Sequence, residues 1–520
     1  MPGTIVRRLT QRHMNILVPC LLALCLRLPG VFNGLPYVRH PDEPVNFRLF
    51  HKMVANRTAL PRFYDYPSLQ YDLQASVHAV VAGLGQLFGA WDSVDSLGMA
   101  PGRPGSNLAL NSASWVVARL VTVSVAVIGV AVVVRLATRL SGSRTWGAVA
   151  GALAATSGVG ILTGFLITPD ALAGTLAISF LAVVMRLHGP GATPADRRWV
   201  VHGAVLLGLA VGAKYNNGAL LVALAAGVAL APAATRPTAR QLAALAGLAG
   251  GVFLLTTPGI VFDFAGFIHG LDRVTDHYGK GHAGYEGNVP AANIGYLWSS
   301  DALAAALAIT AAATLRRRHV AVLAGWVVVY FGFTSIAKVH FDRNLTPLLG
   351  SLAVLGALGG QRVWQWLRTP RGSRSRAMAL ALTLVVLAPL AVRHVTLRAQ
   401  EVSYRLTDYQ ADARAWLTLQ LSPGSRVLTD YYTPWLDERR YELTDRFFVA
   451  QESASAVAEF ATEYDAVILT SLGSGRFVED RSLYPQESAV IDSIRNSACR
   501  TVSFEDAGGY WIEVYFQHCS

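Results

Sequence analysis

The hydrophobic positions of this chain fall into long apolar runs separated by short polar connections. Most runs are near the ~20 residues that a helix needs to cross about 30 Å of hydrocarbon. The eleven runs are 16–28, 115–134, 146–165, 169–185, 199–213, 217–231, 241–262, 294–315, 319–337, 344–361 and 377–395. No small-residue cleavage site follows the first run, which favours an uncleaved transmembrane helix over a signal peptide. The pattern predicts an all-α polytopic membrane protein with about 11 transmembrane helices.

Charged residues in the connections predict how the chain is oriented. If the N-terminus is cytoplasmic, every inner connection contains arginines, with Asp196 as the single acid among them. Lys and Arg accumulate in cytoplasmic loops, so this unbroken alternation supports the topology. An odd number of spans then places the C-terminal part outside. We expect a multi-pass protein of the plasma (inner) membrane with a cytoplasmic N-terminus.

Composition agrees with a membrane protein and removes one class of partner. Of the 520 residues, 52% are hydrophobic and only 15% are charged, whereas soluble domains average about 25% charged residues. This excludes an ordinary cytosolic enzyme and a disordered chain. A net charge of +11 would normally suggest nucleic acid as a partner. Because the basic residues occupy the inner connections, we expect a lipid bilayer and no nucleic acid.

The chain divides into a membrane part and a polar C-terminal part. Residues 1–395 form the predicted transmembrane domain, with long outer loops at 31–114 and 263–293. Within the first loop, 69–87 is amphipathic and predicts a helix along the membrane surface. Residues 396–520 are polar and mixed, and predict a small extracytoplasmic α/β domain.

Turn and strand signals give this outer domain its predicted elements. We expect a helix at 408–421, strands at 426–429 and 466–469, and a hairpin of 500–504 with 510–516. A turn centred on Gly509 would place Cys499 opposite Cys519, close enough for a disulfide. An oxidising compartment favours this bond, and two free thiols are the alternative.

Charged and aromatic residues outside the inner connections gather on the predicted outer side. All four lysines, Lys52, Lys214, Lys280 and Lys338, lie there. Charges near the membrane core are costly, about 2.5–3.5 kcal/mol on insertion scales, and they usually mark function. The candidate site residues are His40, Asp42, Glu43, Tyr66, Tyr71, Arg119, Asp170, Lys214, Tyr215, His340 and Arg343.

These residue types suggest a specific chemistry at the lipid interface. A carboxylate such as Asp42 can act as general base on an acceptor hydroxyl. The cations Lys214, His340 and Arg343 can hold a phosphate. Each also has a plain structural interpretation, in which the acids cap helices and the cations reach the headgroups. No tight ligand spacing supports a metal site, so we assign no cofactor and leave a divalent ion open.

Six segments of the chain form a recognisable set of motifs: 39–43, Arg-His-Pro-Asp-Glu, and 66–69, 119–120, 168–172, 214–216 and 342–349. Together they resemble motifs of the GT-C glycosyltransferases, and most closely their bacterial branch of protein O-mannosyltransferases and aminoarabinose transferases. The segment 39–43 resembles the start of the first outer loop in that family. Asn344 departs from the pattern, because the family often has Tyr there. These enzymes use sugars carried on polyprenyl or dolichyl phosphate.

The resemblance implies a role for each candidate. Asp42 would be the catalytic base of an inverting transfer, with Glu43 orienting it or helping to bind the acceptor. Lys214 and Arg343 would bind the donor phosphate, with Arg119 and His340 as weaker candidates for that role. The substrate cavity would include His40, Tyr66, Tyr71, Asp170 and Tyr215. The implied partners are a polyprenyl-phosphate-linked sugar donor and a glycan, glycolipid or protein acceptor.

Two other functional classes compete with this interpretation. A lipid-linked-sugar transporter or flippase would place charges near the midplane and show internal repeats, and we find no repeat. A non-catalytic scaffold would not require Asp42 beside a cation cluster. The glycosyltransferase interpretation therefore requires that Asp42 lie within about 10 Å of Lys214 and Arg343, around a common cavity.

Overall fold

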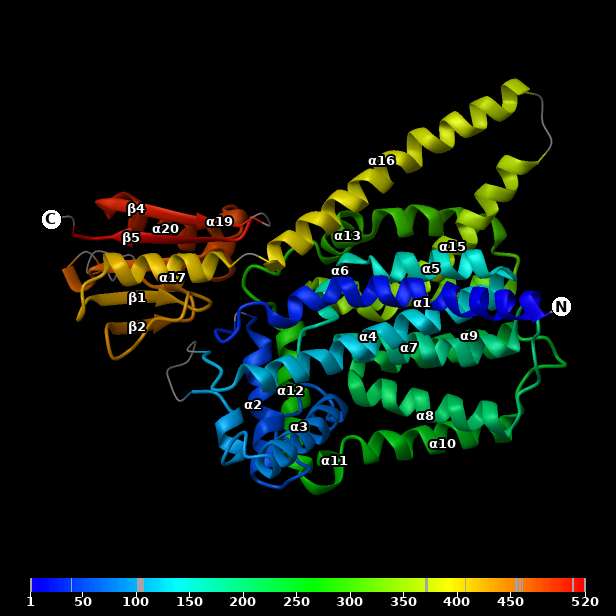
Figure 1. Cartoon of the computed structure of the whole chain (residues 1–520), viewed down its shortest axis with the longest axis horizontal. Helices are drawn as coiled ribbons and strands as arrows, with labels where there is room; N and C mark the ends of the chain where they lie inside the picture. The colour runs from blue at the N-terminus through cyan, green and yellow to red at the C-terminus, as the bar shows by residue number, and fades with distance from the viewer. Residues whose placement is uncertain are drawn as a thin grey trace.

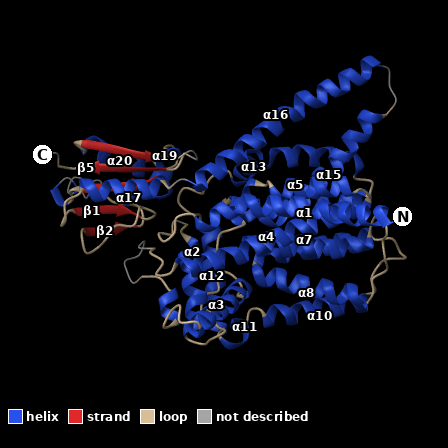
Figure 2. Cartoon of the chain, viewed as in Figure 1, coloured by secondary structure: helices blue, strands red, loops and turns tan. Residues whose placement is uncertain are grey.

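The computed structural model contains a bundle of helices and a smaller domain with a β-sheet (Figures 1 and 2). It describes all residues except 1, 39, 101–106, 370–372, 407, 454–456, 458, 459, 461, 507, 508, 519 and 520. The N-terminus and the small domain lie at opposite ends of the bundle (Figure 1). This is the two-part architecture expected from the sequence.

Each predicted apolar run coincides with one helix or with two consecutive helices. In chain order these are α1 (Pro2–Phe32), α4 (Ser112–Ser141), α5 (Arg144–Ala155) with α6 (Gly158–Thr163), α7 (Asp170–Val184), α8 (Arg197–Ala213), α9 (Leu220–Leu230), α10 (Ala239–Leu255) with α11 (Gly259–Phe262), α13 (Val289–Ala311), α14 (Arg318–Ser335), α15 (Thr346–Arg368) and α16 (Ser373–Leu406). The last helix continues beyond residue 395, where we had expected the membrane part to end.

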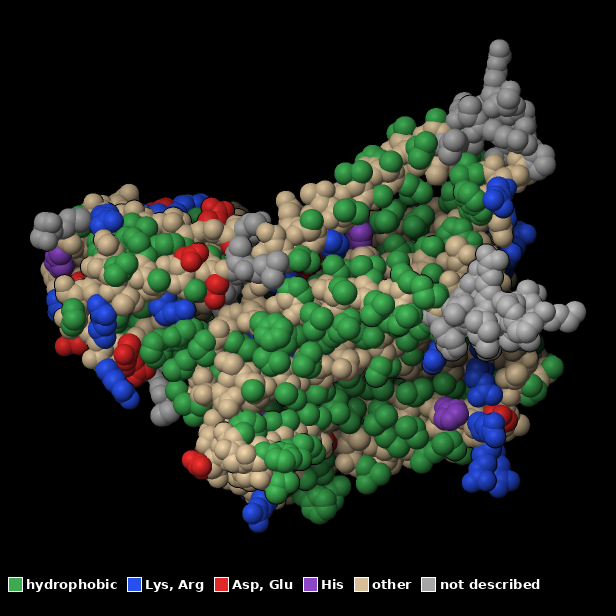
Figure 3. Space-filling view, viewed as in Figure 1, with side chains coloured by type: hydrophobic (Ala, Val, Ile, Leu, Met, Phe, Trp, Pro, Cys, Tyr) green, Lys and Arg blue, Asp and Glu red, His purple; other side chains and the backbone are tan. Residues whose placement is uncertain are grey.

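Length and apolar composition mark many of these helices as membrane-spanning. Among the described residues, five segments are long and apolar enough: Met14–Phe32, Ser112–Ser141, Asp170–Leu187, Val289–Thr314 and Arg318–Ser335. Two further apolar segments, Tyr215–Leu230 and Ala239–Leu255, are shorter. Hydrophobic side chains cover most of the bundle face in Figure 3, and Lys and Arg gather at the end where the N-terminus lies. The chain is a multi-pass membrane protein, and the number of eleven spans stays a prediction.

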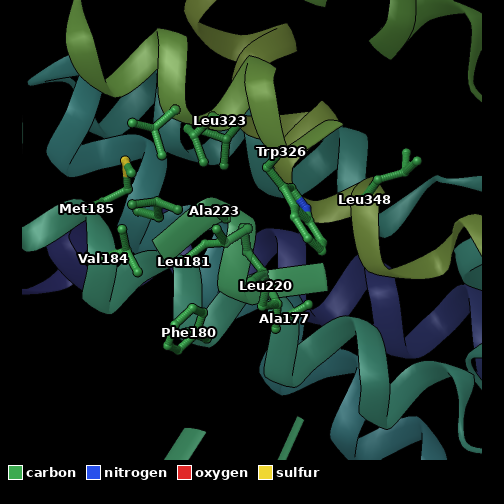
Figure 4. Close-up of a cluster of buried hydrophobic side chains, with 14 of the residues drawn as sticks. Ala177, Phe180, Leu181, Val184, Met185, Leu220, Ala223, Leu323, Trp326 and Leu348 are labelled. Carbon is green, nitrogen blue, oxygen red and sulfur yellow. The ribbon is translucent and has the colours of Figure 1, made fainter. Parts of the chain in front are cut away.

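The centre of the bundle is a close-packed apolar core. Figure 4 shows side chains from α7, α9, α14 and α15 meeting there, among them Phe180, Leu220 and Trp326. Helices α13 and α15 approach closely because Gly359 has no side chain, and a Cβ there would lie 1.9 Å from the carbonyl oxygen of Leu307. Small residues permit such contacts between membrane helices.

Three helices from the outer loops lie at the end of the bundle that faces the small domain (Figure 1). The first loop contains α2 (Asp42–Ala55) and α3 (Leu69–Leu87), and the second contains α12 (Phe264–Lys280). Helix α3 has the bounds of the predicted amphipathic helix. Both outer loops therefore contain helices of several turns.

The small domain is a five-stranded sheet in the order β2-β1-β3-β5-β4. Strand β1 (Arg426–Asp430) pairs in parallel with β2 (Glu442–Arg446) and β3 (Ala466–Thr470), whereas β5 (Trp511–Phe516) is antiparallel to β3 and to β4 (Arg500–Glu505). Helices α17 (Tyr409–Gln420), α19 (Arg476–Glu479) and α20 (Pro485–Ser497) accompany the sheet. The expected C-terminal α/β fold is confirmed. The edge strand β2 was missed because its polar sequence lacks the β-branched runs of buried strands.

The turn of the hairpin is centred one residue earlier than expected, so each residue pairs with a partner two positions earlier in the second strand. Arg500 pairs with Phe516 and Glu505 with Trp511, because the turn closes between Asp506 and Tyr510 rather than around Gly509. This register places Cys499 opposite Gln517 when it is continued. A shift of two residues keeps the side chain on the same face of the sheet. Cys499 is disulfide-bonded, and because Cys519 lies outside the described residues, its pairing with Cys519 stays a prediction.

Candidate active site

Asp42 and Arg343 form an ion pair at the outer end of the bundle, although 300 residues separate them in sequence. Asp42 is the first residue of α2, directly after Pro41, where an acid suits the positive end of the helix. Arg343 belongs to a single 3₁₀ turn, η5 (Asp342–Leu345), between α14 and α15. The glycosyltransferase interpretation requires these two side chains to be close, and they are in contact.

The electrostatics of this pair keep both partners charged. Burial alone would raise the pKa of Asp42, but the charge of Arg343 outweighs it and holds that pKa below its ordinary value. In the other direction, burial opposes and the charge of Asp42 raises the pKa of Arg343. Burial lowers the pKa of His40, whose Nδ1 accepts the backbone N–H of Asp42 at 3.2 Å. His40 is therefore neutral near pH 7.

Lys214 lies next to this pair in a buried polar network. Its Nζ donates to Asp170 Oδ1 at 2.7 Å and to Asn344 Oδ1 at 3.0 Å, and Tyr278 donates to the same Asn344 oxygen at 3.3 Å. Lys214 follows α8 directly and Asp170 begins α7. Asn344 is adjacent to Arg343 in η5, so one turn connects the two cations. The positive charge of Lys214 also contributes to the low pKa of Asp42.

Glu43 and Arg119 form a second ion pair that is fully buried. Arg119 binds the carboxylate through Nε at 2.9 Å and Nη2 at 2.7 Å, and Glu43 also accepts the backbone N–H of Ile167 at 3.0 Å. The remaining nitrogen of Arg119, Nη1, donates to the carbonyls of Gly30, Val31 and Asn33 at the end of α1. This pair ties α1, α2, α4 and the segment before α7 together.

The other predicted residues differ in whether they lie near the Asp42–Arg343 pair. Tyr66 lies within electrostatic range of Asp42 and Arg343, and burial raises its pKa, so its phenol is protonated. His340, in contrast, has both ring nitrogens engaged, with the Tyr296 hydroxyl at 2.7 Å and the Glu286 carbonyl at 3.1 Å. Two further tyrosines brace the loops, because Tyr71 donates to Asn46 at 3.1 Å and Tyr215 donates to the Tyr64 carbonyl at 3.0 Å.

The structure adds residues that were not among the sequence candidates. Asn344 was noticed only as a departure from a motif, and its amide oxygen bridges Lys214 and Tyr278. The ring of Phe341 lies 4.8 Å from the Arg343 guanidinium carbon, in a cation–π contact. Tyr278 carries no local sequence signal, because its role depends on the way α12 folds over the bundle.

No metal site is visible in the described ranges. Among these residues, no group of three or more His, Cys, Asp or Glu side chains is placed to hold a metal ion. A cavity of about 540 Å³ does open near the site, between the ends of α12, α13 and α14, and Lys280, Lys338 and Glu286 are among its lining residues. None of the predicted site residues lines it.

The outer domain is fastened to the second outer loop beside the site. Arg476 at the start of α19 donates to the Ala283 carbonyl at 3.1 Å and contacts His282 Nε2 at 3.3 Å. Tyr484 donates to Glu286 at 2.7 Å and accepts the backbone N–H of Gly284 at 2.9 Å. These contacts hold the small domain against the loop that also supports His340.

Comparison with solved structures shows what fold this architecture has. The apo structure of ArnT from Cupriavidus metallidurans matches over 98% of both chains with a TM-score of 0.53 and 13% identity, and ArnT bound to undecaprenyl phosphate matches over the same shares with a TM-score of 0.50 and 13% identity. The apo oligosaccharyltransferase of Archaeoglobus fulgidus matches over 91% of this chain and 72% of its own, with a TM-score of 0.48 and 14% identity. No protein-family model and no curated protein sequence matches the chain. The GT-C-like fold expected from the sequence motifs is confirmed by the match to ArnT over nearly the whole chain.

Proposed function

We propose that this protein is a membrane glycosyltransferase that moves a sugar from a polyprenyl-phosphate carrier to an acceptor hydroxyl. The observation that carries the proposal is the cluster of two cations, Arg343 and Lys214, paired with the carboxylates Asp42 and Asp170 at one end of an apolar helical bundle. A lipid phosphate needs cations at the membrane surface, and a hydroxyl nucleophile needs a base. The fold shared with ArnT, which has been solved with undecaprenyl phosphate bound, supports the same class of donor.

Each residue of the cluster has a defined part in the proposed reaction. Asp42 accepts the proton of the acceptor hydroxyl as its oxygen forms a bond to the anomeric carbon of the sugar. The bond from that carbon to the phosphate oxygen breaks on the opposite face, so the configuration inverts. Arg343 and Lys214 stabilise the negative charge that develops on the departing polyprenyl phosphate. Glu43 and Arg119 act as a positioning pair that fixes the start of α2.

The same proposal places the protein in the cell. We assign it to the plasma (inner) membrane, with the arginine-rich end of the bundle in the cytoplasm and the outer domain on the other side. The boundary between the two domains is proposed near residue 395, where α16 leads from the bundle to the sheet (Figure 1). The acceptor would be a glycan, a glycolipid or a protein of the cell envelope.

A strain lacking the gene provides the direct test of this function. Mass spectrometry of its envelope glycans, glycolipids and glycoproteins should reveal species that lack one sugar, and the full-length gene should restore them. A polyprenyl-phosphate sugar should accumulate in the deleted strain. Identical glycan profiles in the two strains, with no accumulated donor, would contradict the proposal.

Donor binding should depend on Arg343. The Arg343→Ala protein should bind undecaprenyl phosphate at least tenfold more weakly than wild type, because a charge-assisted contact to the phosphate is lost. Native mass spectrometry of the purified full chain with added undecaprenyl phosphate measures this. Arg273→Ala is a matched control, because Arg273 pairs with Asp65 in an exposed ion pair of the same outer loops. Equal affinity of the Arg343→Ala and Arg273→Ala proteins would remove Arg343 from the donor site.

A further inference from the structure

Tyr432 of the outer domain has a backbone conformation that tyrosine rarely adopts. Its φ is +70°, in the left-handed region, which costs a residue with a Cβ on the order of 1–2 kcal/mol. Bulky residues keep such conformations only where the surrounding structure enforces them, and they concentrate at functional sites. The position of Tyr432 therefore requires a structural cause.

A buried carboxylate anchors the chain two residues before Tyr432. Asp430, at the end of β1, is 2% exposed and accepts four hydrogen bonds: from the backbone N–H groups of Val449, Thr470 and Ser474 and from the Ser474 hydroxyl. Gln410 Nε2 then donates to the carbonyl of Tyr432 at 3.1 Å. Hydrogen bonds thus hold the chain before and after the N–Cα bond of Tyr432, the bond whose rotation is unfavourable.

The segment 431–435, which we call the β1 strap, lies against the loops of the active site. The ring of Trp435 is 5.3 Å from that of Tyr37 in the first outer loop. The Tyr432 ring lies 6.0 Å from the guanidinium carbon of Arg476, which fastens the outer domain to the second loop. The strap therefore contacts the first loop directly through Trp435, and it reaches the second loop through Arg476, whose guanidinium carbon is 5.1 Å from the ring of Tyr285.

The phenol of Tyr432 is a hydrogen-bond donor beside Arg476, at the junction of the outer domain and the second loop. Burial, opposed by Arg476 and assisted by the charge of Asp42, raises its pKa to about 12, so it keeps its proton at neutral pH. In the described part of the chain its hydroxyl makes no hydrogen bond. Tyr66, from the first loop, is likewise within electrostatic range of Asp42. Asp42 is thus within electrostatic range of phenols from both domains.

We propose that Tyr432 binds the acceptor, donating its hydroxyl hydrogen bond to a polar group of the acceptor next to the hydroxyl that Asp42 deprotonates. This inference rests on the proposed transferase function and adds that the outer domain completes the acceptor site. The left-handed backbone of Tyr432 follows the anchored Asp430, and its ring lies beside Arg476, which joins the outer domain to the second loop.

Removing only the hydroxyl tests this role. In a strain lacking the gene, Tyr432→Phe should restore the sugar-bearing species at least tenfold less efficiently than wild type, at equal protein level. Undecaprenyl phosphate binding, measured by native mass spectrometry of the full chain, should stay within twofold of wild type, since the donor site is intact. Tyr432→Asn, which tolerates a positive φ but lacks the ring, should lose the product as well.

Tyr484→Phe is the matched control, because it removes a tyrosine hydroxyl that only fastens the outer domain to the second loop. It should retain product within twofold. The inference is overturned if Tyr432→Phe restores full product, if it loses undecaprenyl phosphate binding in parallel, or if Tyr484→Phe loses as much product. Asp42→Asn separates the two proposals: if it keeps full product the transferase function fails, and if it loses product while Tyr432→Phe does not, only the role of Tyr432 fails.

Discussion

Replacing Asp42 by Asn should abolish sugar transfer while the protein still folds and inserts into the membrane. General-base catalysis contributes about 10²–10⁴ in rate, and an amide at this position cannot accept the proton. Asp42 is partly exposed and forms its ion pair with Arg343, so the isosteric amide should leave the fold intact. The glycan profile of a complemented strain, at matched protein level, measures the effect.

Asp65→Asn is the appropriate control for this variant. Asp65 also lies in the first outer loop and also pairs with an arginine, at 2.6 Å, but its partner Arg273 is more exposed than Arg343 and is not part of the proposed phosphate site. We expect transfer within twofold of wild type for Asp65→Asn. Undecaprenyl phosphate should bind to Asp42→Asn at least as well as to wild type, because Arg343 loses a competing anion. Full transfer by Asp42→Asn would refute the catalytic role.

Replacing Arg119 by Ala should cause the largest loss of stability in the membrane domain. Glu43 would then be a charged carboxylate with no exposed surface and no cation, and breaking a buried pair in this way costs about 3–5 kcal/mol. Three carbonyls at the end of α1 would also lose their donor. Thermal unfolding of the detergent-solubilised protein should show a much lower midpoint and a poor yield.

Two comparisons separate this pairing effect from a general sensitivity to mutation. The double variant Glu43→Gln with Arg119→Met should recover part of the stability, because it removes the uncompensated charge and keeps most of the volume. Arg240→Ala, at an exposed position of α10, should leave the unfolding midpoint unchanged. A wild-type midpoint for Arg119→Ala would show that the pair does not hold α1 and α2 together.

Much of the fold could be predicted from the local sequence, because the length and apolar composition of a run identify a membrane helix. The apolar runs and the amphipathic segment Leu69–Leu87 appear as helices where they were expected. The edge strand β2 did not, because its five residues are mostly polar and its strand conformation is set by pairing with β1. The hairpin turn was misplaced by one residue, since two consecutive glycines allow more than one turn centre.

The sequence indicated many of the residues that form the site, but it did not indicate how these residues are arranged. Asp42 and Glu43 are neighbours in sequence, yet one faces Arg343 and the other is buried against Arg119. Successive residues of a helix point about 100° apart, and the packing of α2 decides which carboxylate meets Arg343. Tyr432 gave no signal at all, because its position depends on how the outer domain docks on the loops.

The ion pair between Asp42 and Arg343 affects the order in which the proposed substrates bind. In the resting protein the proposed base is neutralised by the cation that the donor needs, so neither group is free to act on water or on a stray hydroxyl. Arrival of a lipid phosphate gives Arg343 a new anion and releases Asp42 at the moment when a sugar is present. Under the proposed function, donor would therefore bind before acceptor, and the activated sugar would be protected from wasteful hydrolysis.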